Sequence, residues 1–303
     1  IPLTCDSIPN PAQTGWSKLN YTFDGNYNND FGEAMDIDSN NRWLIVGAPA
    51  GSIGLESISH AHIFRLDLNE APEEIEVLTD NDANNPFGEA VAIEGNVAVV
   101  GSSYNQQDGG NKVFVYRYIN ETWTLEQTIQ QEDLASGNHF GANVQLAKSI
   151  TTSIDPNLLL IGNDRYYTEN MSNQHGRVWV YKHNGTEWIS IYSLDNPAIN
   201  EPDPEGHLSW FGKSMAIDGD FLFVGAHNQA TPTEGGGMLD KGAVFVYKKK
   251  GETYSHKQTL YNPTGQAYDY FGRAISVDGN LAIVGAHNAG STQRGESWVY
   301  RLE

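Results

Sequence analysis

The sequence predicts an all-β fold, a five-bladed β-propeller of four-stranded blades, and three observations lead to it. First, a unit that opens with Phe-Gly occurs five times, starting at residues 31, 87, 140, 211 and 271. Second, the repeats are 53 to 71 residues apart, which leaves room for about four short strands in each. Third, the last unit stops before its fourth strand, and a matching segment precedes the first unit.

The first two strands of each unit form a predicted hairpin. After Phe-Gly comes an alternating segment such as "AVAIEG", then a tight turn, then a second apolar run such as "VAVVG". The turns are Glu94-Gly95-Asn96, Asp218-Gly219-Asp220 and Asp278-Gly279-Asn280 in three of the units. Glycine or asparagine between two alternating runs is the typical signal of a tight hairpin.

The third and fourth strands follow from bulk and spacing. Apolar segments recur as "AHIF" at 61, "VFVY" at 113, "VWVY" at 178, "VFVY" at 244 and "SWVY" at 297, which suits strands buried between sheets. The fourth strand begins with an aromatic residue six positions before an apolar one, as in Trp123 to Ile129, Trp188 to Leu194 and Tyr254 to Leu260. In the first unit "PEEIEVL" takes this place.

The missing fourth strand of the last unit is expected at the N-terminus. The segment "GWSKLNYTFDG" begins with Trp16 and lies ahead of the first Phe-Gly, although Trp16 is five residues from Tyr21 and seven from Phe23. A bulge would absorb that difference. We therefore expect a tail over residues 1–11 and one domain over 12–303, in which residues 15–23 complete the last blade and close the ring. A linear solenoid of five units is the alternative.

Charge and cysteine content restrict the partners. The 303 residues carry a net charge of −20 at pH 7 and an isoelectric point near 4.7, so the surface repels phosphate backbones and nucleic acid is not an expected partner. No apolar run is long enough to insert into a membrane. The single Cys5 has no internal partner and leaves open an inert thiol or an intermolecular bridge. The start at Ile1 suggests a processed terminus, although a trimmed chain would look the same.

The sequence permits secretion. Asn-x-Ser/Thr sequons, the acceptor pattern of N-glycosylation, occur at Asn20, Asn120, Asn170 and Asn184. We expect a secreted or cell-surface protein on this basis, with these four asparagines as candidate glycosylation sites.

The repeated motifs resemble FG-GAP repeats, the units of integrin-α-type propellers, over residues 15–303. The resemblance is carried by the Phe-Gly starts, "VGAP" at 46–49, "VGAH" at 224 and 284, and the "VFVY" strands. It implies a β-propeller. The family's Asp-rich calcium loop between the first two strands is replaced here by tight turns in three units and by "AKSITTSIDPN" in the third, so those calcium sites are not carried over. Integrin propellers also have seven blades, against five here.

Metal ligands are nevertheless present elsewhere. "DGNYNND" places Asp24, Asn26, Asn28 and Asp30 at alternate positions, and "DNDANN" offers Asp80, Asp82 and Asn84. Oxygen ligands in this rhythm suit Ca²⁺, yet neither stretch has the later bidentate Glu of an EF-hand. A calcium site at residues 24–30 and simple Asx-rich turns remain alternatives.

The repeated residues predict structure, and the variable loops predict function. Each Phe is expected to pack between adjacent blades, and each Gly to serve a crowded or left-handed backbone. If strands alternate in direction, the second-to-third loops and the blade connections share one face. That face holds aromatic rings and mostly neutral polar groups, which suit a neutral glycan or a protein loop. The candidate binding residues are Tyr104, Asn105, Arg165, Tyr166, Tyr167, Trp210, His227, Asn228, Tyr270, His287 and Asn288. Loops that only solvate the rim are the alternative.

No catalytic motif is present. The sequence has no G-x-S-x-G, H-E-x-x-H or Walker loop, and Cys5 is poorly placed for a nucleophile. We therefore expect an extracellular, non-catalytic recognition or adhesion module that binds a glycan or protein partner through the loop-rich face. The alternative is a polysaccharide-active lyase or hydrolase with its site on the same face.

Overall fold

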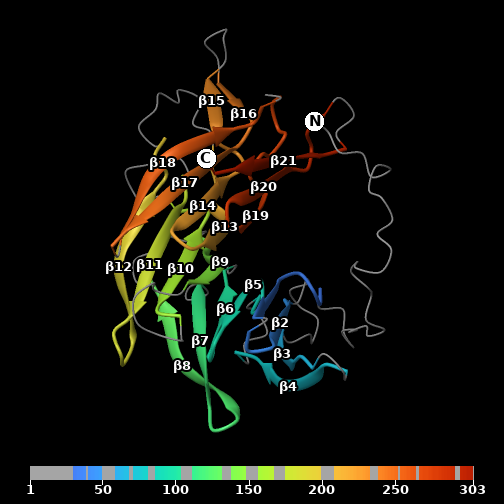
Figure 1. The fold of residues 1–303 in the computed structure, drawn as a ribbon, viewed down its shortest axis with the longest axis vertical. Coiled ribbons are helices and arrows are strands. Elements are labelled where there is room, and N and C mark those ends of the chain that lie inside the picture. The colour runs from blue at the N-terminus through green and yellow to red at the C-terminus, as the bar shows by residue number, and fades with distance from the viewer. Residues whose placement is uncertain are drawn as a thin grey trace.

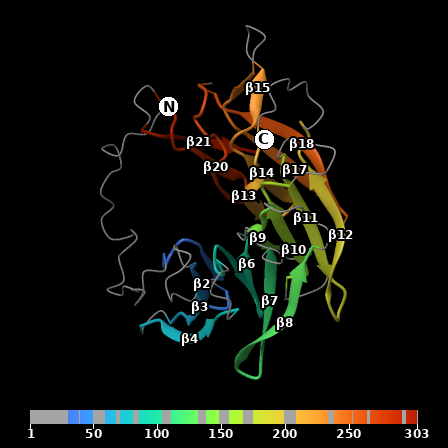
Figure 2. The same ribbon diagram turned by 180° about the vertical axis from the view of Figure 1, so that it is seen from behind.

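The fold is all-β, and the described strands, apart from one short hairpin, form five antiparallel sheets arranged as the blades of a β-propeller. The structure is a computed structural model, and it describes residues 30–38, 40–49, 59–67, 71–80, 86–103, 111–131, 138–147, 156–166, 175–198, 208–232, 238–251, 253–263, 266–290 and 294–302. Figures 1 and 2 show the blades following one another around an arc, from the blue β2 to the red β21. Within the described part of the chain, no helix is suited to spanning a bilayer.

The first two blades have the predicted four strands each. Blade 1 consists of β1 (Met35–Asp38), β2 (Trp43–Ala48), β3 (His60–Arg65) and β4 (Glu73–Leu78). Blade 2 consists of β5 (Ala90–Glu94), β6 (Val97–Ser102), β7 (Lys112–Ile119) and β8 (Thr122–Gln130). In both blades the strands pair in chain order.

The next two blades repeat this order. Blade 3 consists of β9 (Phe140–Ala147), β10 (Leu158–Asn163), β11 (Arg177–His183) and β12 (Trp188–Asp195). Blade 4 consists of β13 (Phe211–Asp218), β14 (Phe221–Ala226), β17 (Ala243–Lys250) and β18 (Thr253–Tyr261). The second-to-third connection of blade 4, expected to be a plain loop, folds back as a small hairpin of β15 (Ala230–Pro232) and β16 (Met238–Asp240). This connection is long and has three consecutive glycines at its middle, which favours such a return.

Blade 5 has three described strands. They are β19 (Ala274–Asp278), β20 (Leu281–Ala286) and β21 (Glu296–Arg301), paired in that order. The expected fourth strand, residues 15–23, lies outside the described residues, as does the expected tail. The predicted turns are present, and their glycines Gly95, Gly219 and Gly279 adopt the positive φ angles of 62°, 54° and 57° that make a two-residue turn possible.

The first strands face the propeller axis, since β1 contacts β5, β5 contacts β9, β9 contacts β13 and β13 contacts β19. The core lies between blades. Phe87, Phe140, Phe211 and Phe271 are fully buried, each among residues of its own blade and of the preceding one. The prediction that these rings wedge between blades is confirmed for these four. Phe31, which opens blade 1, is half-buried and has its ring 5.2 Å from that of His62.

Candidate functional site

One end of the propeller combines two sets of equivalent positions. The residues directly before each Phe-Gly are Asp30, Pro86, His139, Trp210 and Tyr270. The residues that follow the second strands are Pro49, Ser103, Asp164, His227 and His287. Because first strands begin where second strands end, both sets lie at the same end, which we call the loop face. The fold thus brings variable side chains together on an invariant backbone.

The backbone at Trp210 and Tyr270 is left-handed, with φ angles of 55° and 57°. In each case a tight turn closes behind the aromatic residue, through hydrogen bonds of 3.3 Å from Lys213 N to Trp210 O and 3.2 Å from Arg273 N to Tyr270 O. Left-handed backbone is unfavourable for residues with a side chain, and such conformations concentrate at functional positions. The backbone conformation at these two residues is therefore locally unfavourable, and it determines where the two rings lie.

Five side chains from three adjacent blades form a continuous row on the loop face. The Arg165 guanidinium carbon lies 5.9 Å from the Trp210 ring centroid. The centroids of Trp210 and His227 are 4.9 Å apart, and those of His227 and Tyr270 are 5.8 Å apart. The His287 ring stacks on Tyr270 at 5.0 Å with an interplanar angle of 10°. We call Arg165, Trp210, His227, Tyr270 and His287 the ring array.

His227 is the buried centre of the ring array. Its side chain is 1% exposed, and Arg273 Nη1 donates a hydrogen bond of 3.1 Å to its Nε2. Burial, together with the positive charge of Arg273, lowers the pKa of His227 to about 3, so the imidazole is neutral at physiological pH. Because a guanidinium only donates, Nε2 accepts and the ring proton sits on Nδ1.

Three buried polar atoms of this region have no hydrogen-bond partner among the residues that the structure describes. They are His227 Nδ1, Trp210 Nε1 and Asn228 Oδ1. The first two are N–H donors, and the third is a carbonyl acceptor. Buried polar groups are rarely left unpaired, so these atoms mark a place where an additional partner would be stabilised.

A group of charged residues borders the ring array toward the axis. Lys213 Nζ lies 3.5 Å from Glu89 Oε1 and 3.9 Å from Asp164 Oδ2, and His139 Nδ1 lies 3.1 Å from Asp164 Oδ1. Burial opposes ionisation of Asp164, but the hydrogen bond with His139 and the charge of Lys213 hold its pKa below the ordinary value. This network joins blades 2, 3 and 4 at the loop face.

The sequence did not single out these charged residues as candidates, although two of them, Glu89 and Lys213, occupy one equivalent position in the five repeats. The second position after each Phe holds Glu33, Glu89, Ala142, Lys213 and Arg273. Four of the five are charged, with acids on blades 1 and 2 and bases on blades 4 and 5, and the side chains of Glu89, Lys213 and Arg273 make contacts at the loop face. This position lies at the start of the first strand and not in a variable loop, where binding residues are more often found.

The other candidate residues are distributed differently. Tyr166 packs at 5.2 Å against Trp179 and its hydroxyl accepts a 2.8 Å hydrogen bond from Arg177 Nη1, so it belongs to the edge of blade 3 and not to the ring array. Asn228 and Asn288 are half-buried, and their backbone N–H groups bond to Ser209 and Asp269. Tyr104, Asn105 and Tyr167 lie outside the described residues.

The candidate metal and glycosylation residues are only partly described. Asp30 is exposed, with a φ angle of 49°, while Asp24, Asn26 and Asn28 lie outside the described residues. Among the side chains that are described, no group of three or more His, Cys, Asp or Glu is placed to hold a metal ion. Asn120 and Asn184 are exposed in the turns after β7 and β11, at the end opposite the loop face. Asn20, Asn170 and Cys5 are not among the described residues.

Comparison with known proteins supports the repeat assignment. The FG-GAP repeat family matches residues 74–116 and 254–300. Among curated proteins no match is found. The chain is also similar to the crystal structure of Sqt1 from Saccharomyces cerevisiae, with 11% identity, a TM-score of 0.44, and coverage of 90% of this chain and 86% of that one. This second likeness is too weak to support any argument about function.

Proposed function

Because the FG-GAP repeat family matches two stretches of this β-propeller, residues 74–116 and 254–300, we propose that the protein is an extracellular, non-catalytic recognition module that binds a neutral glycan across the ring array. Fold alone does not determine function, so the proposal depends on the side chains of the loop face. Those side chains combine flat rings, which pack against the C–H faces of sugars, with neutral hydrogen-bonding groups.

The three unpaired polar atoms carry the proposal. His227 Nδ1 and Trp210 Nε1 need an acceptor, while Asn228 Oδ1 needs a donor. A sugar hydroxyl both donates and accepts, so a few hydroxyls satisfy all three atoms. The net charge of −20 disfavours acidic polysaccharides, which leaves neutral glycans as the best-matched class.

The exposed sequons support an extracellular location. A glycan on Asn120 or Asn184 would stand at the opposite end from the ring array and leave the binding face open. Production in a eukaryotic secretory pathway should therefore give a protein whose mass falls on treatment with a glycosidase, with binding unchanged. Absence of any attached glycan would remove this support for secretion.

The test is a screen of the full chain against an array of neutral and acidic glycans, followed by calorimetry on the best ligand. Trp210→Phe keeps an aromatic ring but removes the Nε1–H donor together with the five-membered part of the indole, so affinity should fall at least about tenfold, the cost of one lost hydrogen bond to a buried group. Tyr270→Ala and His287→Ala should weaken binding further. Tyr261→Ala, an exposed tyrosine at the outer edge of blade 4, is the matched control and should bind normally.

Other outcomes identify other functions. Affinity should change little between low and high salt, because rings and neutral amides carry the contact. Steep salt dependence would indicate a charged ligand or protein partner at the Lys213 network instead. Release of sugar products from a glycan panel would favour the polysaccharide-active enzyme. Binding that survives the ring substitutions but is lost on chelation would move the site to residues 24–30 and make Ca²⁺ part of it.

A further inference from the structure

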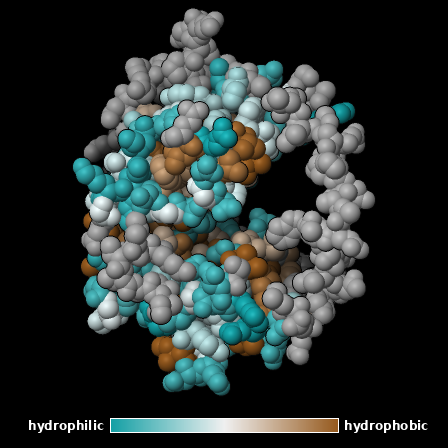
Figure 3. Space-filling model, in the orientation of Figure 1, coloured by the Kyte–Doolittle hydropathy of each residue, from teal (hydrophilic) through white to brown (hydrophobic). Residues whose placement is uncertain are grey.

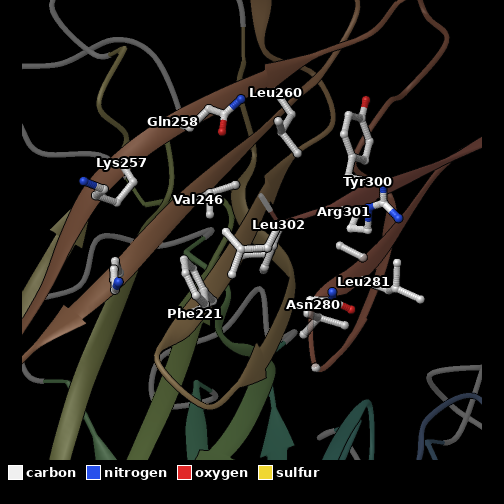
Figure 4. Close-up of a pocket in the computed structure, with 15 residues that line it drawn as sticks. Phe221, Val246, Lys257, Gln258, Leu260, Asn280, Leu281, Tyr300, Arg301 and Leu302 are labelled. Atoms are coloured by element: carbon white, nitrogen blue, oxygen red, sulfur yellow. The ribbon is translucent and has the colours of Figure 1, made fainter.

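A cavity of about 310 Å³ separates blade 4 from blade 5 at the end opposite the loop face. Its walls include Phe221, Val246 and Leu260 of blade 4 and Leu281, Tyr300 and Leu302 of blade 5, and Figure 4 shows these side chains facing a common space. An apolar cavity of about 150 Å³ is enough to hold benzene. The cavity between blades 4 and 5 is therefore large enough for a bulky aromatic side chain.

The corresponding place in the other junctions is filled by the first aromatic residue of a fourth strand. Between blades 1 and 2, Trp123 of β8 packs at 5.3 Å against Trp43 and at 5.2 Å against Tyr118. Trp188 and Tyr254 are likewise buried in the cores of the next two junctions. All three rings pack over the end of the preceding blade.

Equivalent residues show where the ring of a fourth strand would pack between blades 4 and 5. Trp43 and Phe221 both begin the second strand of their blades. Tyr118 and Leu302 both follow the third-strand arginine, and their N–H groups bond at 2.8 Å to the turn residues Asn96 and Asn280. The ring that packs on Trp43 and Tyr118 in blade 2 thus corresponds to a ring on Phe221 and Leu302, two of the residues that line the cavity.

We propose that this cavity is the seat of Trp16, and that residues 16–22 pair along β21 as the fourth strand of blade 5. Among the described residues, β21 has only β20 as a neighbour, so one edge is available. The equivalent edges of β3, β7, β11 and β17 all carry a fourth strand. An apolar cavity next to an open strand edge selects an extended segment with one large aromatic side chain.

The number of residues between Trp16 and the first Phe-Gly is compatible with Trp16 in the cavity. Trp123 and Tyr254 each precede the next Phe-Gly by 17 residues, and Trp16 precedes Phe31 by 15. A strand that starts with Trp16 in the cavity therefore leaves a connection to blade 1 that is two residues shorter than those that follow Trp123 and Tyr254. By analogy with Trp123 opposite Tyr118 and Thr124 opposite Arg117, Trp16 lies opposite Leu302 and Ser17 opposite Arg301.

A disulfide tests this register in the full chain. With Cys5→Ser removing the native thiol, Ser17→Cys and Arg301→Cys should form an intramolecular bond on mild oxidation, since paired residues of neighbouring strands have Cα separations that a disulfide spans. Ser17→Cys with Thr124→Cys, on the outer strand of blade 2, is the control pair and should stay reduced. Mass spectrometry of the digested protein identifies the linked peptides.

Each other result overturns the proposal. A disulfide-linked dimer would make a second copy the donor of the strand. A bond in the control pair alone, or in neither pair, would leave residues 16–22 away from β21.

Two further measurements keep the proposal testable if cysteines perturb folding. Native-state hydrogen exchange should protect the amides of residues 16–22 to a degree similar to residues 123–129. Trp16→Ala should lower the melting temperature about as much as Trp123→Ala, and Trp16→Phe should restore most of the loss. Unprotected amides at residues 16–22 would contradict the placement of Trp16 in the cavity. A Trp16→Ala melting temperature equal to that of the unaltered protein would contradict it as well.

Discussion

At the scale of single residues, the repeat separates core positions from positions on the loop face. The phenylalanine of Phe-Gly is buried in four of the five blades and has one role in all of them. The residue directly before it varies from Asp30 to His139 to Trp210, because its side chain leaves the core at the loop face. Neighbouring positions on one backbone motif thus lie in different environments, with the phenylalanine packed between blades and the preceding residue on the loop face.

Loss of a wedge ring should cost stability without affecting binding. Phe87→Ala and Phe211→Ala each delete a fully buried ring between two blades, which costs about 3 to 5 kcal/mol for buried aromatics. Chemical denaturation measures this loss, with Tyr261→Ala as the exposed control. Glycan affinity well below the melting temperature should be retained. A loss under about 1 kcal/mol would contradict the core role of these rings.

His227 predicts a pH dependence of stability. Its folded-state pKa of about 3 lies below that of an unfolded histidine, so unfolding takes up a proton at intermediate pH. The free energy of unfolding should therefore fall as pH falls from about 6.5 toward 3, by up to about 1.4 kcal/mol per pH unit for one proton. Denaturation of the unaltered protein and His227→Gln at pH 4, 5, 6 and 7 isolates this contribution, because other titrating groups are shared.

The contribution of His227 has a clear signature. The stability difference between the two proteins should shrink or reverse as the pH is lowered, since glutamine carries no titrating proton. Parallel stability curves over this range would mean that His227 is protonated as easily in the folded state as in the unfolded chain.

At the scale of elements, pattern predicted the hairpins but not all of their detail. Alternation and glycine turns located the first and second strands, because those signals are local. The sequence did not predict the register shift that the third and fourth strands share in four blades. It lies between Ile63 and Phe64, Val115 and Tyr116, Val180 and Tyr181, and Val246 and Tyr247. A bulge of this kind depends on twist within the whole sheet and leaves no turn residue in the sequence.

The ring array shows the same limit for the site. The sequence predicted that Trp210, His227 and Tyr270 share one face, because strand direction alternates. It did not predict which of them touch, since those contacts cross from one blade to the next and depend on the left-handed backbone at Trp210 and Tyr270. Tyr166, from the same kind of loop, turns to Arg177 in its own blade instead.

At the scale of the whole molecule, four junctions between blades are built alike. The glycine that precedes the end of each second strand packs against the carbonyl of the next Phe-Gly glycine: Gly47 on Gly88, Gly101 on Gly141, Gly162 on Gly212 and Gly225 on Gly272. A Cβ at these four glycines would lie 2.0 to 2.2 Å from that carbonyl oxygen. No side chain fits there, so glycine is required by close approach of two backbones.

The remaining pair is Gly285 of blade 5 and Gly32 of blade 1. A Cβ at Gly285 would meet nothing closer than 3.7 Å, and one at Gly32 nothing within 4 Å. Apolar residues beside this pair are exposed, including Met35 at 67% and Val299 at 66%, whereas the equivalents Val91 and Val115 are buried. Figure 3 shows hydrophobic surface on both sides of the hollow between the upper and lower blades. These surfaces match the two halves of a fifth junction.

Closure of the ring can be tested at Gly285 alone. If blades 5 and 1 meet in solution as the other blades do, the Gly32 carbonyl will occupy the space beside Gly285. Gly285→Ala should then destabilise the protein about as much as Gly162→Ala, by roughly 1 to 3 kcal/mol, the usual cost of overpacking. Ser190→Ala, an exposed change on the outer strand of blade 3, is the control and should stay within about 0.5 kcal/mol. Urea denaturation compares the three variants. A neutral Gly285→Ala beside a costly Gly162→Ala would mean that the two blades do not meet through this contact, because an uncovered glycine accepts a methyl group without a clash.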